Sequence, residues 1–256
     1  MHYQEYGKEN ASFMLFLHGG GVSSWMWDKK IEYFTHYHCV VPDLPEQGRS
    51  INTNFSIKNS AEKLIKLIEE KAKGKKVIVI GFSLGAQITI QMLSIKSDLI
   101  DYAMINSPLV RPIQFAKKLI RPFVKLAFPL IKNKTFSKVQ AKTLYINQDY
   151  FATYYQESCR MQLETLVKIL EENMSFKIPN DFKQAKGNIL INVGEKEKNI
   201  MKKSAIDLVK NNPNCQAVII PNVGHGVPMA KPNIFNQMIE AWINEGIILE
   251  GKVIKC

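Results

Sequence analysis

Ser83 lies in the pattern G-F-S-L-G of residues 81–85, which follows the apolar run Val77 to Ile80 and precedes a helical pattern. A sharp strand-to-helix turn would lift the serine hydroxyl clear of a sheet, and flanking glycines let the backbone bend without Cβ clashes. The N-terminus of the following helix presents free N–H groups that favour negative charge. These residue types predict Ser83 as the nucleophile of an acyl-transfer reaction.

A glycine-rich turn, H-G-G-G at residues 18–21, follows the apolar run Phe13 to Leu17. Such a turn exposes backbone N–H groups, and acyl transfer needs two donors aimed at the developing oxyanion. We assign these donors to the N–H groups of Gly20 and Leu84. Gly21 could supply a further donor, and the alternative is a tight turn without a ligand role.

His225 follows the strand pattern Ala217 to Ile220 and precedes a helix with one apolar face. It is therefore expected on a loop at the C-terminal end of a strand, where a histidine can act as general base toward a serine. The alternative is an exposed loop histidine without a role. His18 belongs to the glycine-rich turn and is expected to be structural.

A carboxylate should hold the tautomer of the histidine and stabilise its charged form. The strand pattern Asn188 to Val193 runs into G-E-K-E at residues 194–197, ahead of His225 in the chain. These residues alone leave both Glu195 and Glu197 open, and either one could instead be a solvated charge.

Five landmarks in this order resemble the α/β-hydrolase superfamily, in particular its serine esterases and lipases. They are L-H-G-G-G at 17–21, V-P-D-L at 41–44 with G-R-S at 48–50, the Ser83 pattern, G-E-K-E at 194–197, and G-H at 224–225. A strand of this superfamily commonly ends in Gly-x-x-Asp with the last residue as the triad acid, which implies Glu197. The chain departs from its relatives at P-E-Q-G, residues 45–48, and at Ala86, where many have glycine. We interpret Asp43 as structural.

Unalternated apolar runs are typical of strands in a sheet that is covered on both faces. They occur at Phe13 to Leu17, Cys39 to Val41, Lys76 to Ile80, Tyr102 to Ile105, Ile189 to Val193 and Ala217 to Ile220. With one short strand near His2 to Tyr6, they predict an α/β fold with a doubly wound, mostly parallel sheet of about seven strands. This is one strand fewer than the usual eight.

Residues 107–187 interrupt this alternation and are far longer than a crossover requires. We expect them to form a helical cap inserted into a core of residues 1–106 and 188–256. Helices are expected at Ile113 to Ile131 and Asp149 to Asn173, with prolines such as Pro122 breaking or ending them. Six apolar residues of this segment favour an apolar acyl or alkyl substrate, unless they only pack the cap onto the core. They are Phe115, Leu119, Phe123, Leu126, Phe128 and Leu130.

The formal net charge is +11, and the stretch from Tyr102 to Gln148 contains nine Lys and Arg but no Asp or Glu. Such a field could attract anionic substrates or bring the protein into transient contact with an anionic lipid surface. The alternative is a solvated surface. No nucleic-acid partner is expected, because no recognised binding module accompanies the charge.

The length of 256 residues suits one domain with a lid. No apolar stretch reaches the roughly 20 residues that span a bilayer, and the first ten residues lack the pattern of a signal peptide, so we expect a cytoplasmic protein. Four scattered cysteines, the last being Cys256, lack metal-ligand spacing and are expected to be free thiols without a metal site.

These features predict a serine hydrolase that cleaves a carboxylic ester or thioester through an acyl-enzyme intermediate and needs no cofactor. The same triad would serve an acyltransferase, a perhydrolase or a carbon–carbon bond hydrolase. A protein of another class, one that binds a ligand without turnover, is the remaining alternative. The sequence leaves the substrate and the oligomeric state open.

Overall fold

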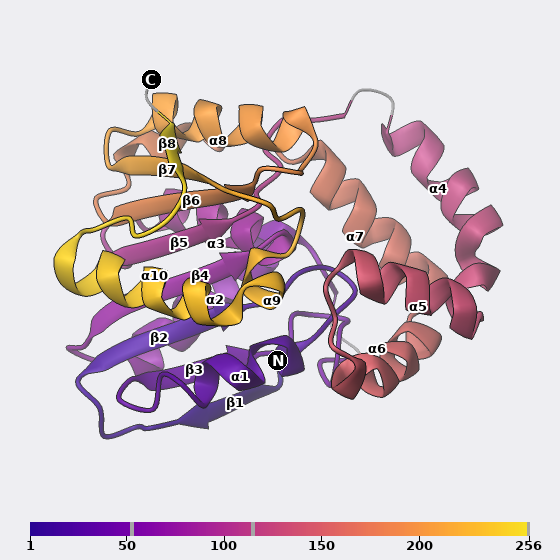
Figure 1. Ribbon diagram of the computed structural model, residues 1–256, viewed down its shortest axis with the longest axis horizontal. Helices are drawn as coiled ribbons and strands as arrows, with labels where there is room; N and C mark the ends of the chain where they lie inside the picture. The colour runs from indigo at the N-terminus through magenta and orange to yellow at the C-terminus, as the bar shows by residue number, and fades with distance from the viewer. Residues whose placement is uncertain (52–53, 114–115, 255–256) are drawn as a thin grey trace.

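A computed structural model describes residues 1–51, 54–113 and 116–254 and is built around one sheet of eight strands (Figure 1). The strand order is β1-β3-β2-β4-β5-β6-β7-β8. The strands are β1 (Tyr3–Tyr6), β2 (Ser12–Leu17), β3 (His38–Pro42), β4 (Lys76–Phe82), β5 (Tyr102–Asn106), β6 (Asn188–Gly194), β7 (Cys215–Ile220) and β8 (Lys252–Ile254). The two edge strands pair antiparallel and the inner strands pair parallel. The predicted mostly parallel sheet is therefore confirmed.

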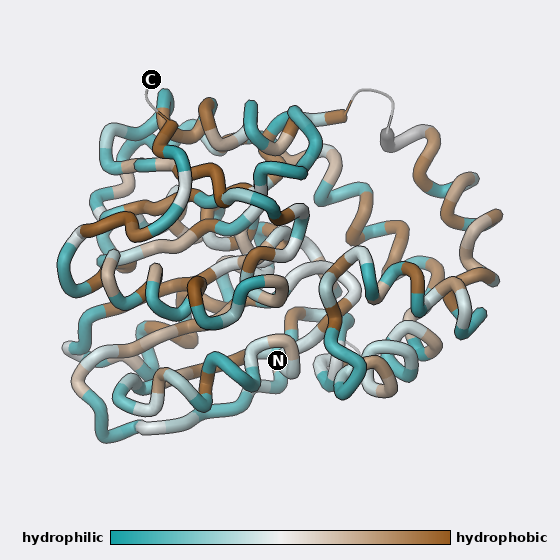
Figure 2. The backbone as a smooth tube through the Cα atoms, in the orientation of Figure 1, coloured by the Kyte–Doolittle hydropathy of each residue, from teal (hydrophilic) through white to brown (hydrophobic). Residues whose placement is uncertain are grey.

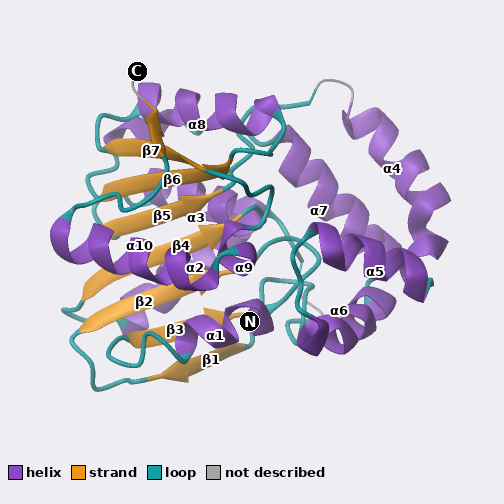
Figure 3. Cartoon of the chain, viewed as in Figure 1, coloured by secondary structure: helices purple, strands orange, loops and turns teal. Residues whose placement is uncertain are grey.

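Helices cover both faces of this sheet (Figure 3), which explains why the inner strands are apolar without alternation. In β2, Phe13 and Leu15 join one buried cluster with α2 (Ile57–Lys71) and α3 (Leu84–Ile95), whereas Met14 and Phe16 join a second cluster with α10 (Pro232–Glu245). The helices and 3-10 turn of the core are η1 (Ser24–Trp27), α1 (Asp28–Ile31), α2 (Ile57–Lys71), α3 (Leu84–Ile95), α8 (Asn199–Asn211), α9 (Val227–Ala230) and α10 (Pro232–Glu245).

The expectation of seven strands is wrong by one, because the strand β8 follows the last helix. Val253 pairs with Val218 of β7, and Gly251 turns the chain into this pairing with a φ of +106°. A Cβ on Gly251 would lie 2.5 Å from Val218 Cγ2, so glycine permits the close approach. Three residues are too few for a periodic pattern, and tertiary pairing alone defines the strand.

Among the described residues, four α-helices lie between β5 and β6, beyond the C-terminal ends of the parallel strands (Figure 1). The elements are α4 (Ala116–Ala127), η2 (Phe128–Lys132), α5 (Lys134–Thr143), α6 (Gln148–Arg160), α7 (Leu163–Ser175) and η3 (Asn180–Gln184). None of the described helices is long and apolar enough to cross a membrane.

Three expectations for this segment are corrected. Pro122 lies inside α4 rather than ending it, since proline removes one N–H donor but keeps a helical φ. The helix α5 was not expected, and it begins where the Asn133 side chain accepts a hydrogen bond from Phe136 N. The helix expected from Asp149 to Asn173 is two helices, α6 and α7. Phe115 and Cys256 lie outside the described residues.

Candidate active site

Ser83 lies on the turn between β4 and α3 with a φ of +52°, a conformation that non-glycine residues rarely adopt. The turn is tight on both sides. A Cβ on Gly81 would lie 2.5 Å from the carbonyl oxygen of Gly85, and a Cβ on Gly85 would overlap the carbonyl oxygen of Leu17. The two glycines therefore allow the strand and the helix to approach closely enough to hold Ser83 in its strained turn.

Three loops at the same edge of the sheet bring Ser83, His225 and Glu197 together. His225 Nε2 lies 3.1 Å from Ser83 Oγ, and His225 Nδ1 lies 2.9 Å from Glu197 Oε2. Because an ionised carboxylate only accepts hydrogen bonds, Nδ1 carries the proton and Nε2 is free to accept one from the serine. The arrangement can therefore remove the proton of the Ser83 hydroxyl.

Glu197 is buried, and its other oxygen is held from two sides. Oε1 accepts hydrogen bonds from Ser107 Oγ at 2.7 Å and from Gly194 N at 2.8 Å. Burial acts to raise the pKa of Glu197, but the hydrogen bonds from His225, Ser107 and Gly194 outweigh it and hold the pKa below its ordinary value. The carboxylate is thus kept ionised beside the imidazole.

Glu195, the rival carboxylate, lies elsewhere. Its Oε2 accepts a hydrogen bond from Asn222 N at 2.9 Å, and its side chain is exposed. The geometry brings Glu197 rather than Glu195 to His225.

The glycine-rich turn lies against this serine turn. A Cβ on Gly19 would lie 3.5 Å from Ser83 Cβ, and one on Gly20 would lie 3.7 Å from Leu84 Cδ2. The N–H of Gly21 donates to Gln47 Oε1 at 2.9 Å and is therefore engaged. In the described part of the chain, no hydrogen bond uses the N–H of Gly20 or Leu84. These two donors remain free to bind an oxyanion.

His18 and Asp43 hold the loops around this turn. His18 is fully buried, its Nε2 accepts from Leu44 N at 2.8 Å, and its Nδ1 donates to the Gly19 carbonyl at 2.7 Å. Asp43 accepts from the backbone N–H groups of Ser24 and Arg49. Both side chains are engaged with the backbone, as a structural role requires.

Comparison with known proteins places the chain in a family. The model of the alpha/beta hydrolase family matches residues 14–237. The chain belongs to this family. It is 23% identical over 261 residues to (E)-2-((N-methylformamido)methylene)succinate hydrolase of Acinetobacter baylyi, a match that covers 94% of this chain and 93% of that protein.

Solved structures with low sequence identity share the fold of this alpha/beta hydrolase. An esterase from Thermogutta terrifontis, with malate bound, gives a TM-score of 0.77 at 18% identity and covers 95% of this chain and 93% of its own. MenH from S. aureus gives a TM-score of 0.75 at 18% identity, covering 95% and 97%.

An apolar cavity of about 380 Å³ lies beside Gly20 in this alpha/beta hydrolase. Its walls come from η2, α5, α6 and α7 together with the glycine-rich turn. The lining residues include Ile131, Val139, Leu144, Tyr154, Met161 and Leu166. Of the six apolar residues expected to favour an apolar substrate, Leu119, Phe123 and Leu126 are exposed on α4 and do not line this cavity.

Sequence reasoning missed two contacts at the site. Ser107, which directly follows β5, holds Glu197, and the only signal was a serine at the end of a strand. Glu157 of α6 accepts hydrogen bonds from Ser23 Oγ at 2.7 Å and Trp25 Nε1 at 2.8 Å. No sequence pattern indicates this link between the inserted helices and the core.

Among the described residues, no group of three or more His, Cys, Asp or Glu side chains is placed to hold a metal ion.

Proposed function

We propose that this alpha/beta hydrolase is a serine hydrolase that cleaves a carboxylic ester or thioester. Ser83 would be the nucleophile, His225 the general base and Glu197 the residue that orients His225. The N–H groups of Gly20 and Leu84 would bind the oxyanion. One observation carries the proposal, namely the unbroken run of hydrogen bonds from Ser83 Oγ through the imidazole to the buried carboxylate.

Each proton in this reaction has a defined place. Ser83 Oγ attacks the carbonyl carbon while its proton moves to His225 Nε2, and the tetrahedral oxyanion accepts hydrogen bonds from the two backbone donors. The carbon–oxygen or carbon–sulfur bond then breaks, and His225 protonates the leaving alcohol or thiol. A water molecule, deprotonated by His225, then attacks the acyl-enzyme. The bond from the acyl carbon to Ser83 Oγ breaks, His225 returns the proton to Oγ, and the acid leaves.

The apolar cavity beside Gly20 supports a small to medium apolar acyl or alkyl group on the substrate. Its volume of about 380 Å³ is at the lower end of the range for small-molecule sites. Two of the similar proteins are named a hydrolase and an esterase, which agrees with this reaction class.

We also propose that residues 107–187 form a cap on a core of residues 1–106 and 188–256. The cavity walls support this division, since α5, α6 and α7 enclose the space next to the glycine-rich turn.

We also propose a cytoplasmic location. The described cysteines Cys39, Cys159 and Cys215 are free thiols, which agrees with a reducing compartment.

A fluorophosphonate probe tests the proposal. The folded protein should be labelled once per chain, and Ser83→Ala should abolish the labelling. Ser94→Ala, on the helix α3 that follows Ser83, should leave the labelling intact. An unlabelled but folded protein would instead favour a ligand-binding protein without turnover. Esters and thioesters of graded acyl length would then define the substrate.

A further inference from the structure

The outer face of α4 exposes large apolar side chains. Leu119, Phe123 and Leu126 have relative exposures of 64%, 70% and 82%. Their spacing of four and three residues places them on one side of the helix. Ile120 and Val124 are buried against Val167 of α7. The apolar arc of α4 is therefore wider than the part that α7 covers.

This exposed surface continues beyond α4. Leu130 of η2 and Val139 of α5 are also exposed. We define the outer apolar face as Leu119, Phe123, Leu126, Leu130 and Val139. The tube coloured by hydropathy shows apolar segments along α4, which lies at the edge of the molecule away from the sheet (Figure 2). Large apolar side chains that are exposed on one face, rather than scattered singly, are typical of an interaction site.

Unpaired cations lie on the same three elements as the outer apolar face, α4, η2 and α5. Arg111 and Arg121 are neutralised, because they pair with Asp207 and Glu164. Five exposed lysines of the same acid-free stretch form no ion pair with any described residue. They are Lys125, Lys132, Lys134, Lys138 and Lys142. The partner of this face must therefore carry negative charge as well as an apolar layer.

We infer that the outer apolar face docks on an anionic lipid surface. Apolar side chains that enter the boundary between headgroups and acyl chains, with basic side chains beside them, bind anionic membranes through apolar burial and electrostatic attraction. A second copy of this chain is disfavoured as the occupant, because it would bring two sets of unpaired lysines together. A lipid surface supplies both the apolar layer and the opposite charge.

The same face reaches the apolar cavity of the proposed active site. Val139 is exposed on the outer face and also lines the cavity, and Ile131 of the cavity wall directly follows Leu130. Docking would bring the cavity rim to the lipid surface. If the proposed function holds, the substrate class is then amphiphilic esters that reside in the membrane.

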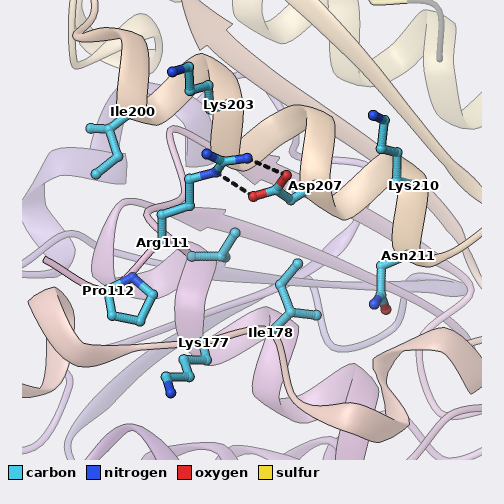
Figure 4. A pocket seen from close by; sticks show the side chains of 10 residues that line it. Arg111, Pro112, Lys177, Ile178, Ile200, Lys203, Asp207, Lys210 and Asn211 are labelled. Atoms are coloured by element: carbon cyan, nitrogen blue, oxygen red, sulfur yellow. Dashed lines mark hydrogen bonds and ion pairs between the residues drawn. The ribbon is translucent and has the colours of Figure 1, made fainter. Parts of the chain in front are cut away.

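A separate hollow of about 920 Å³ is lined by basic side chains and offers control residues for the docking test (Figure 4). In it Arg111 is paired with Asp207, and the amino groups of Lys203 and Lys210 do not point toward one another. None of its described lining residues is an exposed large hydrophobic side chain. Lys203 is therefore a basic residue away from exposed large apolar side chains and can serve as the control for charge alone.

Co-sedimentation with phosphatidylcholine vesicles, with and without phosphatidylglycerol, tests the docking. The protein should bind the vesicles that contain phosphatidylglycerol, and added salt should weaken the binding. The double variant Phe123→Ser/Leu126→Ser should lose at least about tenfold in partitioning, since two large side chains no longer enter the lipid. Lys138→Glu/Lys142→Glu should also bind more weakly. Leu249→Ser, which alters another exposed leucine, and Lys203→Glu should bind as the wild type does.

Three results would overturn the inference. They are the absence of vesicle binding, equal binding by the folded Phe123→Ser/Leu126→Ser variant, and a dimer in gel filtration that this variant dissociates. Unfolding temperatures check that each variant is folded. Ser83→Ala should bind vesicles as the wild type does, so a protein that docks but is not labelled by fluorophosphonate would contradict the proposed function and leave the docking intact.

Discussion

The hydroxyl of Tyr145 accepts a hydrogen bond from the backbone N–H of Gly224 at 2.9 Å. Tyr145 follows α5 in the inserted segment, and Gly224 directly precedes His225. On the other side of His225, a Cβ on Gly226 would lie 3.2 Å from Tyr145 Cδ2. One tyrosine of the insertion therefore contacts the histidine loop on both sides of the proposed general base.

Tyr145→Phe should lower kcat by about three- to tenfold and leave KM nearly unchanged. The variant keeps the ring but leaves Gly224 N–H without its acceptor, so His225 is held less firmly toward Ser83. Steady-state kinetics on one soluble ester measures the effect. Tyr155→Phe is the matched control, because the Tyr155 hydroxyl donates to the Lys132 carbonyl, within the inserted segment. Equal kinetics of the two variants would remove Tyr145 from a positioning role.

The two glutamates of the loop after β6 should differ in their effect on turnover. Glu197→Gln should reduce kcat at least about tenfold, because the amide no longer stabilises the charged imidazole. Glu195→Gln should retain nearly full activity, since its exposed carboxylate accepts a hydrogen bond from Asn222 N and does not contact His225 among the described interactions. Purified variants assayed with one ester decide the matter, and a crippled Glu195→Gln beside an active Glu197→Gln would reverse our assignment.

Ser83, Glu197 and His225 could be predicted because each lies on the turn or loop that follows an apolar run. The carboxyl ends of parallel strands meet at one edge of a sheet, so residues after β4, β6 and β7 converge even though they are far apart in the chain. The local patterns also predicted the mostly parallel sheet. Sequence thus placed these three side chains near one another, and their catalytic roles remain predictions.

Contacts that depend on packing could not be predicted from the sequence. A serine at a strand end does not reveal its partner, and Ser107 reaches Glu197 only when β5 and β6 pair. Tyr145 meets Gly224 only after α5 and the preceding helices fold back over the sheet edge. Leu119 and Phe123 were expected to favour an apolar substrate or to pack the cap onto the core, because periodicity indicates an apolar face but not what covers it.

The hydrogen bond from Ser107 to Glu197 should be visible in the pH dependence of stability. A carboxyl whose pKa is lower in the folded state stabilises the fold above its ordinary value of 4.5, and this stabilisation is lost as the pH falls through the folded value. Ser107→Ala removes one donor, so the pKa of Glu197 should rise toward its ordinary value. The variant should lose about 2 kcal/mol at neutral pH and less in acid.

Urea unfolding at a series of pH values measures this difference. Ser137→Ala is the control, because buried Ser137 donates to the Ile131 carbonyl and not to a carboxylate. Its loss of stability should be the same at every pH. A Ser107→Ala loss that likewise does not change with pH would show that Ser107 does not act through the charge of Glu197.

Gly85→Ala should destabilise the protein although alanine favours a helix. Helix propensity alone would gain about 1 kcal/mol. The new Cβ, however, would overlap the carbonyl oxygen of Leu17, and relief of this clash must move α3 away from the sheet at a cost of about 2 kcal/mol or more. Because α3 begins directly after Ser83, the rate of fluorophosphonate labelling should fall as well. Ser94→Ala on the same helix should change the free energy of unfolding by no more than about 0.5 kcal/mol. A Gly85→Ala variant that unfolds at the same urea concentration as the wild type and is labelled at the same rate would show that the close contact between α3 and β2 is not needed to hold the serine.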